Sequence, residues 1–199
     1  MRDRFFVEGV HAAGDRVVLA ADDARKLATV LRRRSGDRVQ IVDSGGSAFA
    51  ATLDVDGRAV GATLDAELAR PGVETALRVT IAQAVPKGQK MDFVVEKATE
   101  LGAHAIVPVR SLRVVGSETS PAKVERWRRI AKSAAQQAGR TRVPDVADVH
   151  GCIEGNAVHV SGDAVVPAVA ACLKCSRQVD LRQQNTAENF AMMVRFGWE

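Results

Sequence analysis

The stretch Leu77–Arg110 reads LRVTIAQAVPKGQKMDFVVEKATELGAHAIVPVR, and it decides the fold of the chain. Leu77–Val85 is a short run of β-branched and small apolar residues, which is typical of a buried parallel strand. From Gln89 the apolar residues recur at helical spacing, and Gly102 is the C′ residue expected to end that helix. Ala105–Val109 is a second apolar strand. The order strand, helix, strand predicts a parallel pair joined by a right-handed crossover.

The helix in this stretch carries positive charge along the edge of its apolar stripe. At about 100° per residue, Lys90 and Lys97 fall nearly in line and Lys87 lies nearby. Phosphate is a natural partner for three ammonium groups. The alternative is a solvated helix face on which Lys97 and Glu100 form an i,i+3 pair.

The basic charge of the chain is concentrated in its middle third. The sequence has 199 residues and a net charge of +4. Residues 1–78 hold 12 basic against 12 acidic residues, residues 79–150 hold 12 against 7, and residues 151–199 hold 4 against 5. This excess in one segment is the footprint expected of a nucleic-acid-binding protein.

No apolar run reaches about 18 residues, and the N-terminus lacks the apolar core of a signal peptide. We therefore expect a cytoplasmic protein with no membrane span. Cys152, Cys172 and Cys175 are an odd number of cysteines and do not suggest a disulfide framework. The spacing Cys172–Cys175 would supply only half of a zinc site, so no metal is expected.

The first 70 residues predict a small, mostly antiparallel β-barrel with one helix. Asp22 or Asp23 is the expected cap of that helix, which ends in the arginines Arg32–Arg34. This arginine run suits either the helix dipole or an RNA contact. The expected strands, separated by turn residues, are Arg4–Val7, Arg16–Leu19, Arg38–Val42, Ser47–Val55 and Arg58–Leu68.

A second basic helix is predicted after the central unit. Ser120 is its cap, Pro121 its first residue, and Gly139 closes it. Trp127 lies on the apolar stripe, where a core position is favoured over a base-stacking role. Beyond Gly151 the pattern weakens, with strands expected around Val158, Val160, Val165 and Val166 and a short helix over Ala168–Leu173.

Four motifs resemble the RsmE family, the small-subunit ribosomal RNA uridine-N3 methyltransferases of the SPOUT superfamily. They are Arg4–Val7 (RFFV), Val30–Arg32 (VLR) with Gly36–Asp37, Lys87–Pro108 (KGQKMDFVVEKATELGAHAIVP), and the helix from Arg126–Trp127 through Ala134–Gln137 to Arg140 and Val143–Pro144. The resemblance implies a PUA-like RNA-binding β-barrel over residues 1–70. It also implies a SPOUT-type α/β methyltransferase domain with a trefoil knot over residues 73–199.

The sequence departs from the family pattern where the cofactor, S-adenosylmethionine, should bind. The Gly-Pro-Glu-Gly-Gly loop of the family does not occur, so we expect residues 151–180 to be divergent or partly deleted and the knot to be incomplete. Leu181–Ala187 (LRQQNTA) is similar to the second cofactor segment, with Asn185 in place of glutamate. It gives Leu181, Arg182, Thr186 and Ala187 as cofactor-binding candidates and predicts weak or absent cofactor binding.

The function implied by the resemblance is methyl transfer from S-adenosylmethionine to N3 of a uridine in 16S ribosomal RNA. A catalytically impaired RNA-binding member of the family is the alternative. The partner would be 16S ribosomal RNA or the small ribosomal subunit, and a homodimer would form through Phe190, Met193, Val194 and Trp198. The spacing identifies no general base. The candidate RNA contacts are Arg4, Arg32, Arg33, Lys87, Lys90, Lys97, Arg110, Arg129 and Arg140.

Overall fold

The computed structural model divides the chain into two compact units. Unit 1 consists of Met1–Glu74 and Ala135–Arg142, and unit 2 of Thr75–Ala134 and Val143–Glu199. The structure describes residues 3–56, 59–69, 74, 78–86, 88–110, 120–154, 157–159, 165–167, 170–172 and 191–197.

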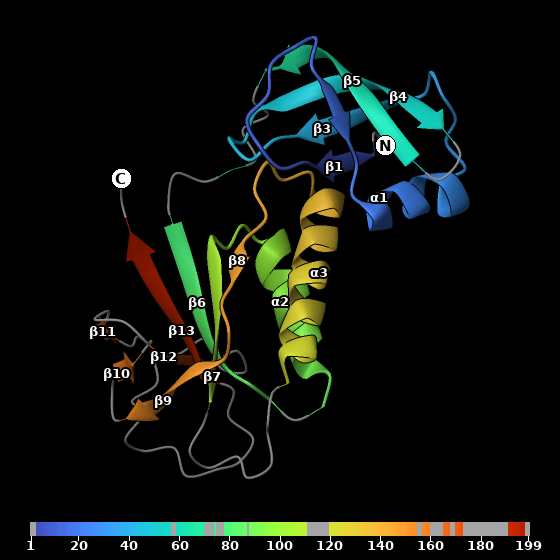
Figure 1. Ribbon diagram of the computed structural model, residues 1–199. Helices are drawn as coiled ribbons and strands as arrows, with labels where there is room; N and C mark the ends of the chain where they lie inside the picture. Colours follow the sequence, from blue (N-terminus) through green and yellow to red (C-terminus); the bar gives the residue numbers. More distant parts are fainter. Residues whose placement is uncertain are drawn as a thin grey trace. The chain divides into compact units, whose positions relative to one another are not determined.

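Unit 1 is built on a five-stranded sheet (Figure 1). Its strands are β1 (Arg4–Phe6), β2 (Arg16–Val18), β3 (Arg38–Val42), β4 (Ala48–Asp56) and β5 (Ala59–Leu68). Their order is β1-β3-β4-β5-β2, in which β1 pairs with β3 in parallel and every other pair is antiparallel. The predicted strands and their mostly antiparallel arrangement are confirmed.

The core of unit 1 follows from period-two alternation along these strands. Side chains at every second position of β3, β4 and β5 turn inward and pack with the helix. The largest fully buried members are Phe5, Leu27, Ile41, Phe49, Leu53 and Leu64.

The helix of unit 1 starts earlier than predicted and changes pitch. The α-helix α1 (Ala21–Arg25) continues as the π-helix η1 (Lys26–Val30). The expected aspartate cap is wrong, because Ala20 is the N-cap residue and no side chain caps the helix. Asp22 and Asp23 lie within the first turn, where negative charge favours the helix dipole.

Unit 2 contains the predicted strand-helix-strand unit. It comprises β6 (Arg78–Ala84), α2 (Lys90–Glu100) and β7 (Ala105–Arg110), and β6 and β7 pair in parallel. Gly102 has φ +96°, in agreement with its expected role after the helix. The predicted order of strand, helix and strand and the parallel pairing are confirmed.

The second basic helix, α3 (Pro121–Ala138), packs with α2 against the strands (Figure 1). Trp127 is fully buried in that core, which confirms the prediction made for it. β7 also pairs in parallel with β8 (Asp145–Val146) and with β9 (His150–Glu154), which follow α3 in the chain. Pro108, which has no N–H to donate, lies between the part of β7 paired with β8 and the part paired with β9.

The remaining strands complete an eight-stranded sheet in which β6 is flanked by β7 and β13. They are β10 (Ala157–His159), β11 (Val165–Pro167), β12 (Ala170–Cys172) and β13 (Ala191–Gly197). The strands expected around Val158, Val165 and Val166 are confirmed. The short helix expected over Ala168–Leu173 is wrong, because residues 170–172 pair with β13 and strand pairing outweighs a weak local preference. The predicted knot depends on residues outside the described ones.

Candidate nucleic-acid interface and cofactor site

Lys97, a predicted phosphate contact, is neutralised within its own helix. Its ammonium nitrogen lies 2.7 Å from a carboxylate oxygen of Glu96 and 2.9 Å from one of Glu100. The hydrogen bonds that Lys97 donates, first to Glu96 and then to Glu100, raise the pKa of Lys97. The i,i+3 pair that the sequence offered as an alternative is therefore present. Lys90 is exposed at the first residue of α2.

Two of the basic residues of α3 are also paired with acids. Arg126 reaches Asp92 at 2.6 Å, and Arg128 reaches Asp148 at 2.9 Å and contacts Glu125 as well. Hydrogen bonding to Glu125 raises the pKa of Arg128. Arg129 is exposed, and its guanidinium Nε lies 3.5 Å from the carbonyl oxygen of Glu125. Lys97, Arg126 and Arg128 are thus paired with acids of the same segment, while the net positive charge of residues 79–150 is unchanged.

Arg4 and Arg140 are buried inside unit 1. Arg4 is 8% exposed, and it donates to the carbonyl oxygen of Arg140 at 2.9 Å, to that of Gly139, and to the side-chain oxygen of Gln40. Arg140 is 3% exposed and pairs with Glu74 at 2.8 Å. These two guanidinium groups connect the C-terminal end of α3 to the sheet of unit 1, so we do not include them in the interface proposed below.

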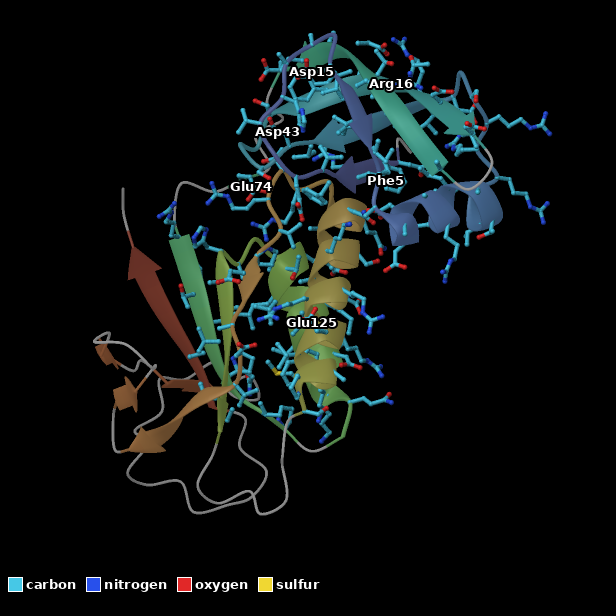
Figure 2. All side chains as sticks on the ribbon, in the orientation of Figure 1. Phe5, Asp15, Arg16, Asp43, Glu74 and Glu125 are labelled. Atoms are coloured by element: carbon cyan, nitrogen blue, oxygen red, sulfur yellow. The ribbon has the colours of Figure 1, made fainter. Side chains whose placement is uncertain are left out.

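Glu74 holds three donors at the centre of this network, which we call the Glu74 cluster (Glu74, Arg140, Thr141 and Arg142; Glu74 is labelled in Figure 2). Burial raises the pKa of Glu74. The hydrogen bond and charge of Arg140 and the backbone N–H groups of Thr141 and Arg142 outweigh burial, and the net pKa is lowered. Burial lowers the pKa of Arg4, and the negative charge of Glu74 opposes that change.

The arginine run after η1 contains both paired and unpaired members. Arg33 donates two hydrogen bonds to Asp3, at 2.7 and 3.0 Å, and these hydrogen bonds raise its pKa. Arg32 is exposed and has φ +52°. The guanidinium groups of Arg32, Arg34 and Arg25 make no hydrogen bond or ion pair with any residue that the structure describes. Arg25 was not predicted as an RNA contact, and Arg34 was considered only as a member of the run Arg32–Arg34.

Some predicted site residues lie where no side chain is described. Lys87 and the cofactor candidates Leu181, Arg182, Thr186 and Ala187 fall outside the described residues, and Arg110 is described only as backbone of β7. Within the described residues, no group of three or more His, Cys, Asp or Glu side chains could hold a metal ion. No helix in the described part of the chain has the length and apolar character of a membrane span.

Gln83 is an unsatisfied polar residue near the carboxyl end of β6. Its side chain is fully buried, and its amide nitrogen donates to the carbonyl oxygen of Ala84 at 2.9 Å. Its amide oxygen Oε1 has no hydrogen-bond partner among the described residues. The carboxyl ends of parallel strands are where open α/β sheets bind ligands. A buried acceptor in that place fits a ligand with N–H donors, as S-adenosylmethionine has in its amino groups.

These features place the chain among α/β proteins with an RNA methyltransferase domain, and comparison with known proteins supports this class. The family model of the RNA methyltransferase domain matches residues 73–156. Ribosomal RNA small subunit methyltransferase E of Bacillus subtilis is 33% identical over 135 residues, which are 66% of this chain and 53% of that protein. The protein of the same name from Mycobacterium tuberculosis is 32% identical over 151 residues, covering 73% of this chain and 56% of its own length.

A solved structure of a protein with the same name is also similar to this chain. Ribosomal RNA small subunit methyltransferase E from Neisseria gonorrhoeae, bound to S-adenosylmethionine, has a TM-score of 0.67 and 31% identity. The match covers 75% of this chain and 62% of that one. The chain is thus similar to proteins of the RsmE family over 66–75% of its own length. It spans about half the length of the curated relatives it matches.

Proposed function

We propose that this protein transfers a methyl group from S-adenosylmethionine to N3 of a uridine in 16S ribosomal RNA. The observation that carries the proposal is the match of residues 73–156 to the RNA methyltransferase domain, which falls on the β6-α2-β7 unit and on α3. The relatives named as ribosomal RNA small subunit methyltransferases match a longer part of the chain, 66% and 73% of it.

For this methyl transfer, the main task of the protein is to position the uridine relative to the methyl group. N3 of uridine carries an imide proton, which must leave before the nitrogen can form a bond to the methyl carbon. When bound, S-adenosylmethionine supplies a methyl group on a positively charged sulfur, which departs as a neutral thioether. Cationic side chains that hold the RNA phosphates fix the uridine relative to that methyl group, and such alignment supplies much of the rate.

The candidate phosphate contacts differ in whether an acidic side chain already binds them. Lys90 and Arg129 are exposed on α2 and α3. Lys97 and Arg33 reach RNA only in competition with Glu96, Glu100 and Asp3. We keep Lys87 and Arg110 as candidates on the sequence argument.

An RNA-binding protein with impaired catalysis is the second candidate. The observation in its favour is the absence of a Gly-Pro-Glu-Gly-Gly loop from the sequence, together with Asn185 in place of the family's glutamate. Glycines let the backbone approach a ligand closely, and side chains in their place close that space.

Calorimetric titration with S-adenosylmethionine separates the two candidates when it is combined with methylation of 16S ribosomal RNA. A dissociation constant in the low micromolar range and a uridine that stops reverse transcription after the reaction support the methyltransferase. RNA affinity without cofactor binding supports the impaired protein. The absence of both RNA binding and cofactor binding would contradict both candidates.

We further propose a cytoplasmic homodimer in which unit 1 is a PUA-like RNA-binding barrel. The segment predicted to supply dimer contacts contains β13, which pairs antiparallel with β6. Sedimentation at micromolar concentration is the test of the dimer. A species near 21.3 kDa alone would exclude it.

A further inference from the structure

The end of the helix in unit 1 has a backbone conformation that its sequence does not favour. The N–H of Arg33 donates to the carbonyl oxygen of Leu27 at 2.9 Å, and the N–H of Leu31 donates to that of Lys26 at 2.9 Å. Arg32, with φ +52°, therefore occupies the left-handed position after a helix, where glycine is the usual residue. Among the described residues it is the only non-glycine with positive φ.

Two features of this helix end are associated with functional sites rather than with stability. Short π-helical turns such as η1 occur often at such sites. Non-glycine residues in strained backbone conformations cluster at sites that contact a ligand. An arginine retained where glycine would relax the backbone suggests that its side chain is needed.

The arginines around this position differ from the other described arginines of unit 1. Arg25, Arg32 and Arg34 are exposed, and their guanidinium groups make no hydrogen bond or ion pair with the described residues. Arg16 and Arg38 are equally exposed, but each is paired with an aspartate, Asp54 and Asp65 respectively. Figure 2 shows long side chains with nitrogen at their tips extending outward from the helix of unit 1. We call Arg25, Arg32 and Arg34 the α1–η1 arginine surface.

We propose that the α1–η1 arginine surface binds the phosphate backbone of the substrate RNA, and that Arg32 is held in its strained conformation for this purpose. The identity of the ligand as RNA rests on the proposed function. Guanidinium groups match phosphate oxygens in geometry and charge, and unpaired ones bind phosphate without first breaking an ion pair. This surface therefore positions RNA on unit 1 without reading its sequence.

The test compares two double variants of the full-length protein that remove the same charge. Binding of 16S ribosomal RNA is measured by filter retention between 50 and about 300 mM salt, a range in which phosphate contacts lose affinity steeply. R25Q/R34Q should reduce the slope of log K against log salt by up to about 1.5 units, as expected for two lost phosphate contacts. R16Q/R38Q, in which the removed arginines were already paired, should leave the slope unchanged. Equal slopes for the wild type and R25Q/R34Q, or equal losses in both pairs, would overturn the proposal.

The role of Arg32 is tested by the variant Arg32→Gly, which removes the side chain and also relieves the backbone strain at this position. We expect the melting temperature to rise by about 2–4 °C while RNA affinity falls. RNA binding as tight as that of the wild type would remove Arg32 from the surface.

The same experiments distinguish failure of this inference from failure of the proposed function. If the wild type binds 16S ribosomal RNA and methylates it while R25Q/R34Q binds with an unchanged slope, only the arginine surface is wrong. If the wild type binds heparin as tightly as RNA and methylates no RNA, the proposed function is wrong. The assignment of RNA as the ligand of the α1–η1 arginine surface is then wrong as well.

Discussion

The indole nitrogen of Trp127 on α3 donates a hydrogen bond to a carboxylate oxygen of Asp92 on α2, at 3.1 Å. The other carboxylate oxygen of Asp92 accepts from Arg126 at 2.6 Å. Since Trp127 is fully buried, its indole N–H cannot form a hydrogen bond to water in place of the one to Asp92. One carboxylate in the first turn of α2 thus joins the two helices that pack on the sheet of unit 2.

Asp92→Ala should lower the free energy of unfolding by about 1–3 kcal/mol, because it leaves the buried indole N–H unsatisfied. Asp92→Asn is the matched control, since its amide oxygen still accepts from Trp127 and only the charge facing Arg126 is lost. Urea denaturation measures both. Equal losses for the two variants would show that the ion pair, rather than the indole contact, is what stabilises the unit.

The Glu74 cluster predicts a stability that depends on pH. The folded pKa of Glu74 is lowered, so its carboxylate contributes stability above its unfolded pKa and loses it as pH falls through the folded pKa. Glu74→Gln should therefore reduce stability at neutral pH and flatten its decline in acid. Glu67→Gln, on the exposed part of β5, is the control and should leave the acid limb unchanged. Parallel stability curves for Glu74→Gln and the wild type would contradict this reading.

Gln83→Met should stabilise the protein without ligand by about 1 kcal/mol, because a buried acceptor without a partner is replaced by an apolar group of similar volume. The same variant should bind S-adenosylmethionine more weakly if Oε1 accepts from the cofactor. Thermal denaturation and calorimetry report the two effects separately. A destabilised variant would mean that Oε1 is satisfied in solution by an internal water molecule.

Lys97→Gln should change the salt dependence of RNA binding little, since Glu96 and Glu100 already neutralise its charge. The double variant K90Q/R129Q should reduce the slope of log K against log salt by up to about 1.5 units. Filter binding over a salt series measures both variants. A larger change for Lys97→Gln than for the double variant would place Lys97, freed from its glutamates, at the RNA.

The elements with strong periodicity and clear caps were predictable from sequence. The β6-α2-β7 unit was predicted because the apolar residues change from a continuous run to helical spacing and then to a second continuous run. Gly102 marks the end of the helix. α3 followed from Ser120, Pro121 and Gly139 in the same way. Local chemistry is enough for such elements because the residues that decide them are close in sequence.

The pairing of charges was not predictable in the same way. Arg140 and Glu74 are 66 residues apart, and no spacing rule connects them, so Arg140 looked like a free cation. The aspartate cap failed for a related reason: Asp23 is buried and bonded to Gln136, 113 residues away. The strand at Ala170–Cys172 depends on its partner β13. Contacts distant in sequence decided each of these cases.

Unit 1 is discontinuous in the chain, and this sets an order for its synthesis. The carbonyl oxygens that Arg4 binds belong to Gly139 and Arg140, and the donors that hold Glu74 follow directly after them. In a nascent chain that ends before residue 139, the side chains of Arg4 and Glu74 therefore lack the hydrogen-bond partners that residues 139–142 supply in the folded protein. The N-terminal unit reaches its final state only after the whole of α3 has emerged from the ribosome, so a fragment cut at residue 74 would lack the part that completes it.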